Sequence, residues 1–228
     1  MKTLSRIFDF IFPRECHICG NNLPAGQDYV CAACLSRLPR TLYHRVKDNP
    51  MERRFMGQFP YRCATGYFFY SRGSEIATLM HDLKYRKFRG LARFMGKFVA
   101  EELSVTGYLS DIDMIMPIPM HFIKKARRGY NQTEEISLGI SSVTGIPVVE
   151  NLKAVRGHKT QTSLSLQQRI RNIDGVFKVV RSEELKNKKI LLVDDVCTTG
   201  TTLSCAATEL SQSAVGIELT ILTLGVTF

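Results

Sequence analysis

A segment in the C-terminal part of the chain constrains the fold most, because its features follow one another in a set order. Residues 190–193 form a short apolar run that predicts a buried parallel strand. Asp194 and Asp195 stand at its C-terminal end, and a loop of small, hydroxylated residues follows at 198–202. Residues 203–210 then have the apolar spacing of a helix. The sequence therefore predicts a strand, a turn and a helix N-terminus in direct succession.

A turn of this kind forms an anion site, because free backbone N–H groups and the helix dipole point toward the ligand. The Thr hydroxyls add donors, and Gly200 allows close approach of the backbone. The two carboxylates would repel a phosphate, so we expect them to accept hydrogen bonds from ribose hydroxyls. The segment therefore predicts a ligand with a phosphate and a vicinal diol. The alternative interpretation is a core strand with two surface Asp residues and a Thr-rich cap.

Four of the seven cysteines form two C-x-x-C pairs, separated by eleven residues that predict a short hairpin. Each pair is expected to form a hairpin that supplies two thiolates from one tight turn, which is typical of a tetrahedral Zn²⁺ site. We therefore expect a structural zinc ribbon; two disulfides or a redox pair are the alternatives. Cys197 and Cys205 are expected to be small buried side chains. The predicted metal ligands are Cys16, Cys19, Cys31 and Cys34.

The chain has 31 Lys and Arg against 21 Asp and Glu, a net charge of +10 that favours an anionic ligand, a nucleic acid, or both. No apolar run approaches the ~18 residues of a transmembrane helix, so we expect no membrane span. Residues 1–12 have apolar positions at helical spacing and predict a short amphipathic helix packed on the protein. Membrane contact is the alternative for this helix.

Strands and helices alternate along the rest of the chain, which favours a parallel sheet with helices on both faces. Ser74 has the position of a helix N-cap. Residues 36–60 are basic and predict a connector with a short helix, for which a solvated linker is favoured over a nucleic-acid surface. The predicted strands are 61–70, 114–119 and 217–224, and the predicted helices are 75–85, 90–103 and 133–143.

A basic segment, residues 117–132, directly follows the second predicted strand. Ligands of open α/β sheets bind beyond the C-terminal ends of the strands, so these cations would lie opposite the phosphate loop. We predict functional roles for Arg128, Asn131 and Gln132, and a basic surface loop at Lys124 and Lys125. Another polar and basic stretch, residues 156–172, has the length of a lid or of a disordered segment, and a lid would close over a bound substrate.

The segment 190–202 resembles the 5-phosphoribosyl-1-diphosphate (PRPP) motif of type I phosphoribosyltransferases, and the chain as a whole resembles the ComF family of amidophosphoribosyltransferase-like competence proteins. The resemblance implies an α/β, Rossmann-like parallel sheet flanked by helices, with a small four-cysteine zinc ribbon. It implies an N-terminal helix and zinc-ribbon module at 1–45, a basic connector at 46–60 and a phosphoribosyltransferase domain at 61–228. It is carried by the two Cys pairs, Leu83-Lys84-Tyr85, Pro117-Ile118-Pro119, Arg128-Gly129-Tyr130-Asn131-Gln132, Gln161 with Leu164, Arg169 with Asn172, and residues 193–200.

The same resemblance implies PRPP binding with Mg²⁺, a cytoplasmic location and a role in DNA uptake during natural transformation. Single-stranded DNA and a competence helicase would be its partners. The first hypothesis is a phosphoribosyltransferase of unknown acceptor, and the alternative is a non-catalytic, PRPP-sensing factor that binds single-stranded DNA. Purine-salvage relatives carry an Asp at the position of Thr198, so a purine base is not indicated as acceptor.

Within this resemblance, Asp194 and Asp195 would hold the ribose hydroxyls, directly or through metal, and Arg128 would take the leaving diphosphate. These three are the predicted catalytic residues, acting by positioning and electrostatics. The predicted PRPP-binding residues are Asp194, Asp195, Val196, Cys197, Thr198, Thr199, Gly200, Thr201, Thr202, Met120, His121, Arg128, Asn131 and Gln132.

Overall fold

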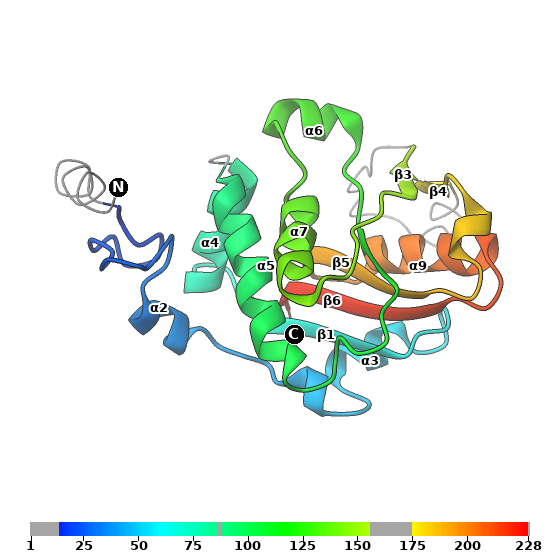
Figure 1. The fold of residues 1–228 in the computed structure, drawn as a ribbon, viewed down its shortest axis with the longest axis horizontal. Helices are drawn as coiled ribbons and strands as arrows, with labels where there is room; N and C mark the ends of the chain where they lie inside the picture. Colours follow the sequence, from blue (N-terminus) through cyan, green and yellow to red (C-terminus); the bar gives the residue numbers. More distant parts are fainter. Residues whose placement is uncertain (1–13, 86–87, 156–174, 228) are drawn as a thin grey trace.

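The computed structural model describes residues 14–85, 88–155 and 175–227, and a four-stranded parallel sheet lies at its centre (Figure 1). All three strand pairings are parallel, which confirms the predicted α/β class. The strand order places the predicted ligand strand in the interior of the sheet, between two neighbours. In spatial order the strands are β1 (Cys63–Phe69), β6 (Glu218–Val226), β5 (Lys189–Cys197) and β2 (Met114–Pro117).

Helices cover both faces of the sheet, and alternate residues of β5 are buried against each. Leu191 and Val193 belong to the core formed with α4 (Glu75–Tyr85), α5 (Arg89–Ser104) and α7 (Gln132–Thr144). Ile190 and Leu192 belong to the core formed with α3 (Pro50–Phe55) and α9 (Thr201–Ser213). An uninterrupted apolar run is therefore needed, because neither face of this strand meets water.

The predicted elements agree closely with those observed for β1, α4, α5, β2, α7 and β6. Ser74 Oγ accepts a hydrogen bond from the Ala77 N–H at 3.3 Å, which confirms the predicted N-cap of α4. The sequence pattern did not predict α6 (Phe122–Arg128), where a surface loop was expected. It also did not predict the antiparallel pair of strands β3 (Leu152–Ala154) and β4 (Phe177–Val179). The predicted helix at 1–12 and lid at 156–172 lie outside the described residues. No described helix is both long and apolar enough to cross a membrane.

The expectation of a solvated linker is wrong for the part of the connector that forms α3. Asn49 caps this helix, accepting hydrogen bonds from the N–H groups of Met51 and Glu52 at 2.9 and 3.1 Å. Its amide also donates to the Ala64 carbonyl of β1 at 3.0 Å. Met51 and Phe55 are fully buried, so α3 completes the second face of the core. The division of the chain at residues 45 and 60 stays a prediction.

The N-terminal module differs from the predicted ribbon of two hairpins. Residues 14–31 contain turns and one isolated bridge, Glu15 to Asn22, and the second Cys pair lies at the start of α2 (Ala32–Arg37). A helix forms in place of the second hairpin, and Cys34 is its buried residue. Cys16 and Cys34 are buried in the same core as α4 and α5. The module is therefore packed on one helical layer of the sheet.

Candidate functional site

The acid pair lies within β5, because this strand extends to Cys197 and so beyond the predicted apolar run. Pairing with β6 continues through Asp194 opposite Thr223 and Cys197 opposite Val226. The Asp194 carboxylate accepts a hydrogen bond from the Asp195 N–H at 2.8 Å, and Asp195 accepts one from the Val196 N–H at 2.6 Å. Each carboxylate is thus held by the backbone of the next residue.

Asp195 is buried and receives two further donors from helices on the same face. Its Oδ2 atom lies 2.9 Å from Lys84 Nζ of α4 and 2.8 Å from Gln132 Nε2 of α7. Gln132 Oε1 in turn accepts from Arg128 Nη1 at 3.4 Å. The structure therefore brings together Arg128, Gln132 and Asp195, which the sequence predicted, with Lys84, for which it predicted no role at the site. The signal for Lys84 was available in the Leu83-Lys84-Tyr85 string.

Electrostatics distinguish the two carboxyl groups. Burial raises the pKa of Asp194 to about 8, and the charge of neighbouring Asp195 acts in the same direction. Burial alone would lower the pKa of Lys84, but Asp195 and then Asp194 outweigh it, so the pKa of Lys84 is raised. Asp194 is therefore largely protonated at neutral pH and Lys84 is charged.

We expect Asp194→Asn to stabilise the free protein at pH 9 more than at pH 5. Asp194 keeps its proton in the native state up to about pH 8, whereas in the unfolded chain it loses it near pH ~4. The native state binds more protons across this window, so wild-type stability from this group falls as pH rises through it. Asn carries no charge at any pH, so melting at pH 9 should rise by at least ~2 °C relative to wild type.

The measurement is thermal melting of both proteins at pH 5, 7 and 9. Asp28→Asn is the matched control, because Asp28 is an exposed carboxylate paired with Arg14 far from β5 in sequence. A melting difference between wild type and Asp194→Asn that is equal at all three pH values would contradict the expectation.

The loop after β5 is shorter than predicted, because Thr201 and Thr202 already form the first turn of α9. Gly200 precedes this helix with φ +81°, and a Cβ there would lie 2.8 Å from Phe55 Cε1. Both the left-handed backbone and the contact with α3 require glycine at this position. The hydroxyls of Thr199 and Thr201 are 2.9 Å apart. The loop therefore presents backbone N–H groups and hydroxyls at a helix N-terminus.

Arg54 of α3 supports this loop, although the sequence indicated only a charged connector residue. Its guanidinium donates to the carbonyl of Thr198 and, at 2.8 Å, to that of Thr227. It also lies 3.6 Å from the buried sulfur of Cys197, whose predicted burial is confirmed. No sequence pattern could reveal this contact, because 144 residues separate Arg54 from Thr198.

A small cavity of about 20 Å³ lies where β5, the loop and α9 meet. It unites the first carboxylate of the acid pair with the whole hydroxyl loop, as the sequence predicted. Its lining is Asp194, Val196, Cys197, Thr198, Thr199, Gly200, Thr201, Thr202 and Leu203.

The remaining predicted ligand residues lie at the exit of β2. Asn131 caps α7, accepting from the Thr133 N–H at 3.3 Å and donating to the Ile118 carbonyl at 3.1 Å, so its polar atoms serve the fold. His121 precedes α6, with its ring centroid 4.5 Å from that of Phe122. Among the described residues, no hydrogen bond or ion pair joins His121 or Met120 to the acid pair. The structure thus brings neither of them to the acid pair.

Arg128 has the strongest signature of a ligand-binding cation. Its guanidinium lies 5.4 Å from the centroid of the Tyr85 ring. Its Nε atom is buried and has no hydrogen-bond partner within the part of the chain that the structure describes. An unpaired buried donor is costly, so this atom is suited to an anionic ligand. Lys124 and Lys125 are exposed, as expected, and Lys125 pairs with Glu134 at 3.3 Å.

A larger cavity of about 780 Å³ lies between the cysteine module and α5, away from these residues. Its charges balance, and Arg93 is already paired with Glu135 at 2.8 Å. It is therefore poorly suited to a polyanion. The charged residues that line it are Asp28, Glu101 and Glu135 with Arg89, Arg93 and Lys97.

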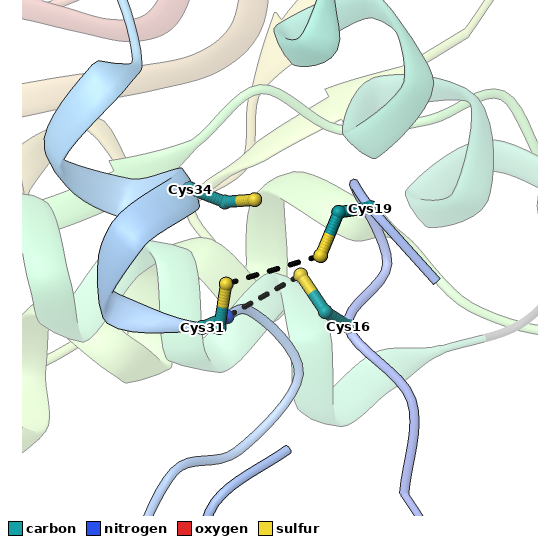
Figure 2. A group of neighbouring side chains, drawn as sticks. All are labelled: Cys16, Cys19, Cys31 and Cys34. Carbon is teal, nitrogen blue, oxygen red and sulfur yellow. Dashed lines mark hydrogen bonds between the residues drawn. The ribbon is translucent and has the colours of Figure 1, made fainter. Parts of the chain in front are cut away.

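The sulfur atoms of the four paired cysteines converge, two from the N-terminal turn and two from the start of α2 (Figure 2). All four lie within 4.8 Å of one another, and those of Cys19 and Cys31 are 4.0 Å apart. A tetrahedral ion with Zn–S bonds of about 2.3 Å holds its sulfurs about 3.8 Å apart. The cluster can therefore hold one such ion after little movement.

The surroundings of the cluster favour the thiolate of Cys16 but not that of Cys34, because burial and the neighbouring cysteines raise the pKa of Cys34 to about 12. The Cys31 N–H donates to Cys16 Sγ at 3.4 Å, and Arg37 Nη2 donates to Cys34 Sγ at 3.4 Å. Burial alone would raise the pKa of Cys16, but backbone N–H groups, that of Cys19 foremost, lower it to about 6. Thiolates are the form that binds a metal, so the four-sulfur donor set fits the ion once Cys34 has released its proton on binding.

Comparison with known proteins identifies the class of protein. Residues 92–215 match the family model described as the phosphoribosyl transferase domain, and the chain belongs to this family. Together with the parallel sheet, this confirms the predicted type I phosphoribosyltransferase fold.

Among individual proteins, the chain is 35% identical to Competence protein F of Haemophilus influenzae (strain ATCC 51907 / DSM 11121 / KW20 / Rd) over 118 residues, 51% of each chain. This confirms the predicted resemblance to ComF proteins, although the match spans only about half the length of this relative. Two solved structures are also similar, each over 57% of this chain and 25% of the other, with TM-scores of 0.39. They are the glutamine PRPP amidotransferase from B. subtilis complexed with ADP and GMP (20% identity) and the allosteric regulatory enzyme of purine biosynthesis (21%). At this level of similarity, neither informs the function of this chain.

Proposed function

We propose that this chain binds PRPP with Mg²⁺ and transfers its phosphoribosyl group to an acceptor that is still to be identified. The observation that carries the proposal is the cavity in which Asp194 meets the hydroxyl loop and the N-terminus of α9. A phosphate can bind the N–H groups there, while the carboxylates serve the ribose one sugar away. In the transfer, the bond from ribose C1 to the diphosphate oxygen breaks and diphosphate leaves with the electron pair. The acceptor bonds to C1 and loses a proton.

Each part of the proposed site has one task. The N–H groups and hydroxyls at 198–202 hold the 5-phosphate, and Asp194 and Asp195 hold the ribose hydroxyls. Arg128, whose Nε lacks a partner among the described residues, takes the diphosphate. Mg²⁺ would neutralise part of the diphosphate charge. The residues contribute positioning and electrostatic stabilisation of positive charge on the sugar.

A second candidate function is binding of single-stranded DNA by a PRPP-sensing protein that does not turn PRPP over. The surface of α6 favours it, because Phe122 and Ile123 are 71% and 61% exposed beside exposed cations. Aromatic side chains beside cations suit single strands, whose bases stack and whose phosphates are charged. The similarity to Competence protein F supports a role in competence. The proposal adds a role in DNA uptake in the cytoplasm, with a competence helicase as a further partner.

The proposal includes one structural Zn²⁺ on Cys16, Cys19, Cys31 and Cys34. It also includes the division into the zinc module at 1–45, the connector at 46–60 and the transferase domain at 61–228. The position of the four sulfurs supports the first point.

Calorimetric titration of PRPP with Mg²⁺ into the full chain, repeated with single-stranded DNA and paired with a diphosphate assay, tests both candidates. We expect micromolar binding. Diphosphate release that depends on an added acceptor supports the transferase, and binding without release under any condition supports the sensor. Absence of PRPP binding with and without DNA contradicts both candidate functions. The cysteine module and α6 would then become the candidate functional sites.

A further inference from the structure

The last turn of α4 lies between the cysteine cluster and the acid pair. On one side, Asp82 Oδ2 is 2.8 Å from Nδ1 of His17, the residue that follows the first cysteine of the cluster. On the other side, Lys84 Nζ is 2.9 Å from Asp195 Oδ2. Residues two apart on a helix project about 200° from each other, so Asp82 and Lys84 reach opposite neighbours. One helical turn therefore connects the two sites.

His17 is held in a fixed position, as a connection between the two sites requires. Its backbone N–H donates to the Tyr29 carbonyl at 2.8 Å. Its ring packs edge to face against the Phe88 ring, with 4.5 Å between the ring centroids. The cysteines on either side of it, Cys16 and Cys19, belong to the cluster. Asp82 is 4% exposed, and His81 Nδ1 also lies 3.7 Å from its other oxygen. A buried carboxylate held by an imidazole is a strong and directional contact.

The rest of the turn makes contacts on the ligand side. The Tyr130 hydroxyl donates to the Leu83 carbonyl, and the Arg128 guanidinium stacks on the Tyr85 ring. Leu83, Lys84 and Tyr85 are consecutive, so a shift of this one turn displaces both the Tyr85 ring beside Arg128 and the Lys84 ammonium beside Asp195.

We propose that His17 and Asp82 are positioning residues for the acid pair. Their hydrogen bond fixes the last turn of α4 and, through Lys84, sets the position of the Asp195 carboxylate. The inference rests on the proposed PRPP site for its functional consequence. It also gives the cysteine cluster a task beyond its own module, since the cluster holds His17 in place.

The test compares His17→Phe with His17→Asn in the full chain, at matched metal content. Phe keeps a ring against Phe88 but has no donor, whereas the Asn amide places a donor near the position of Nδ1. We expect the affinity for PRPP with Mg²⁺ to fall about tenfold in His17→Phe, the loss of one charge-assisted hydrogen bond. His17→Asn should recover part of this loss. Asp28→Asn, a change in the same module that does not touch α4, should bind as wild type does.

A second readout needs no ligand. In protein labelled with ¹³C at the lysine ε-carbon, the Lys84 titration reports its contact with Asp195, because that contact raises the pKa of Lys84. We expect this pKa to move toward the ordinary lysine value in His17→Phe. If that variant does not fold, His17→Leu, which also removes the donor, takes its place with the same expectations.

The two readouts separate the inference from the proposed function. If wild type binds no PRPP, the proposed function fails, while the Lys84 titration still tests the coupling. An unchanged Lys84 titration in His17→Phe overturns the inference, even where PRPP affinity falls, because the effect then bypasses Lys84. If the Lys84 titration shifts in His17→Phe but the affinity for PRPP stays unchanged, the coupling stands and its proposed effect on PRPP binding is overturned.

Discussion

Replacing both Asp194 and Asp195 by Asn is expected to weaken the binding of PRPP with Mg²⁺ by more than about 100-fold. At pH 9, above the raised pKa of Asp194, both carboxyl groups are ionised; each hydrogen bond from a ribose hydroxyl to such a carboxylate contributes about 1.5–3 kcal/mol, and two together exceed a factor of 100. The fold should persist, because Asn has nearly the volume of Asp and can still accept from Gln132. Lys84 is 26% exposed in its side chain and can reach water. The substitution at position 194 also removes a carboxyl group whose pKa is raised by burial. The stability gained there offsets part of the stability lost with the ion pair between Lys84 and Asp195.

Calorimetry measures the affinity, and circular dichroism with thermal melting measures the fold. Asp113→Asn is the matched control, because its carboxylate accepts from the Lys189 N–H at 2.7 Å at the opposite end of β5. It should bind PRPP as wild type does. Near-wild-type affinity in the double variant would remove the acid pair from the site and with it the proposed function.

Loss of the metal from the cysteine cluster is expected to destabilise more than the N-terminal module. A strong chelator at low pH should release about one Zn²⁺ per chain, since protonated thiols do not bind it. Cys16 and Cys34 share one core with Leu79, Leu83 and the residues of α5. Without the ion, we expect faster hydrogen exchange in residues 14–38 and in α4, together with a lower melting temperature.

Metal analysis of the freshly purified protein and hydrogen exchange before and after chelation check this prediction. Cys34→Ser should reproduce the effect of the chelator, whereas Cys63→Ser, which changes a cysteine of β1 outside the cluster, should retain the metal. Protein purified without zinc, or exchange that changes only in residues 14–38, would contradict the prediction.

Local sequence patterns predicted an element correctly where its environment is the same along its length, such as burial on both faces of a sheet or on one face of a helix. The apolar run 190–193 is buried on both faces of the sheet, and helices at 75–85 and 90–103 follow their apolar spacing to within a residue or two. The acid pair, the hydroxyl loop and the start of α9 are contiguous, so their proximity follows from chain connectivity alone. The two Cys pairs were identifiable for the same reason.

The errors occurred where an element depends on a distant partner. In α3, the basic residues Arg53 and Arg54 obscured the spacing of Met51 and Phe55, whose burial requires the far face of the sheet. In α6, Phe122 and Ile123 are exposed, so no apolar face could predict the helix. A hairpin was expected for the second Cys pair, but α2 forms instead because Cys34 and Leu38 pack inward.

The sequence by itself determined the parallel α/β fold, the candidate anion loop with its two carboxylates, and the four candidate metal ligands. These features depend on residues that are neighbours in the chain. Only the tertiary structure decided which partners surround them: Lys84 and Gln132 on Asp195, Arg54 beneath the loop, and His17 on Asp82. These contacts join residues separated by 63 to 144 positions, where strand order and helix packing, rather than local pattern, set the distances.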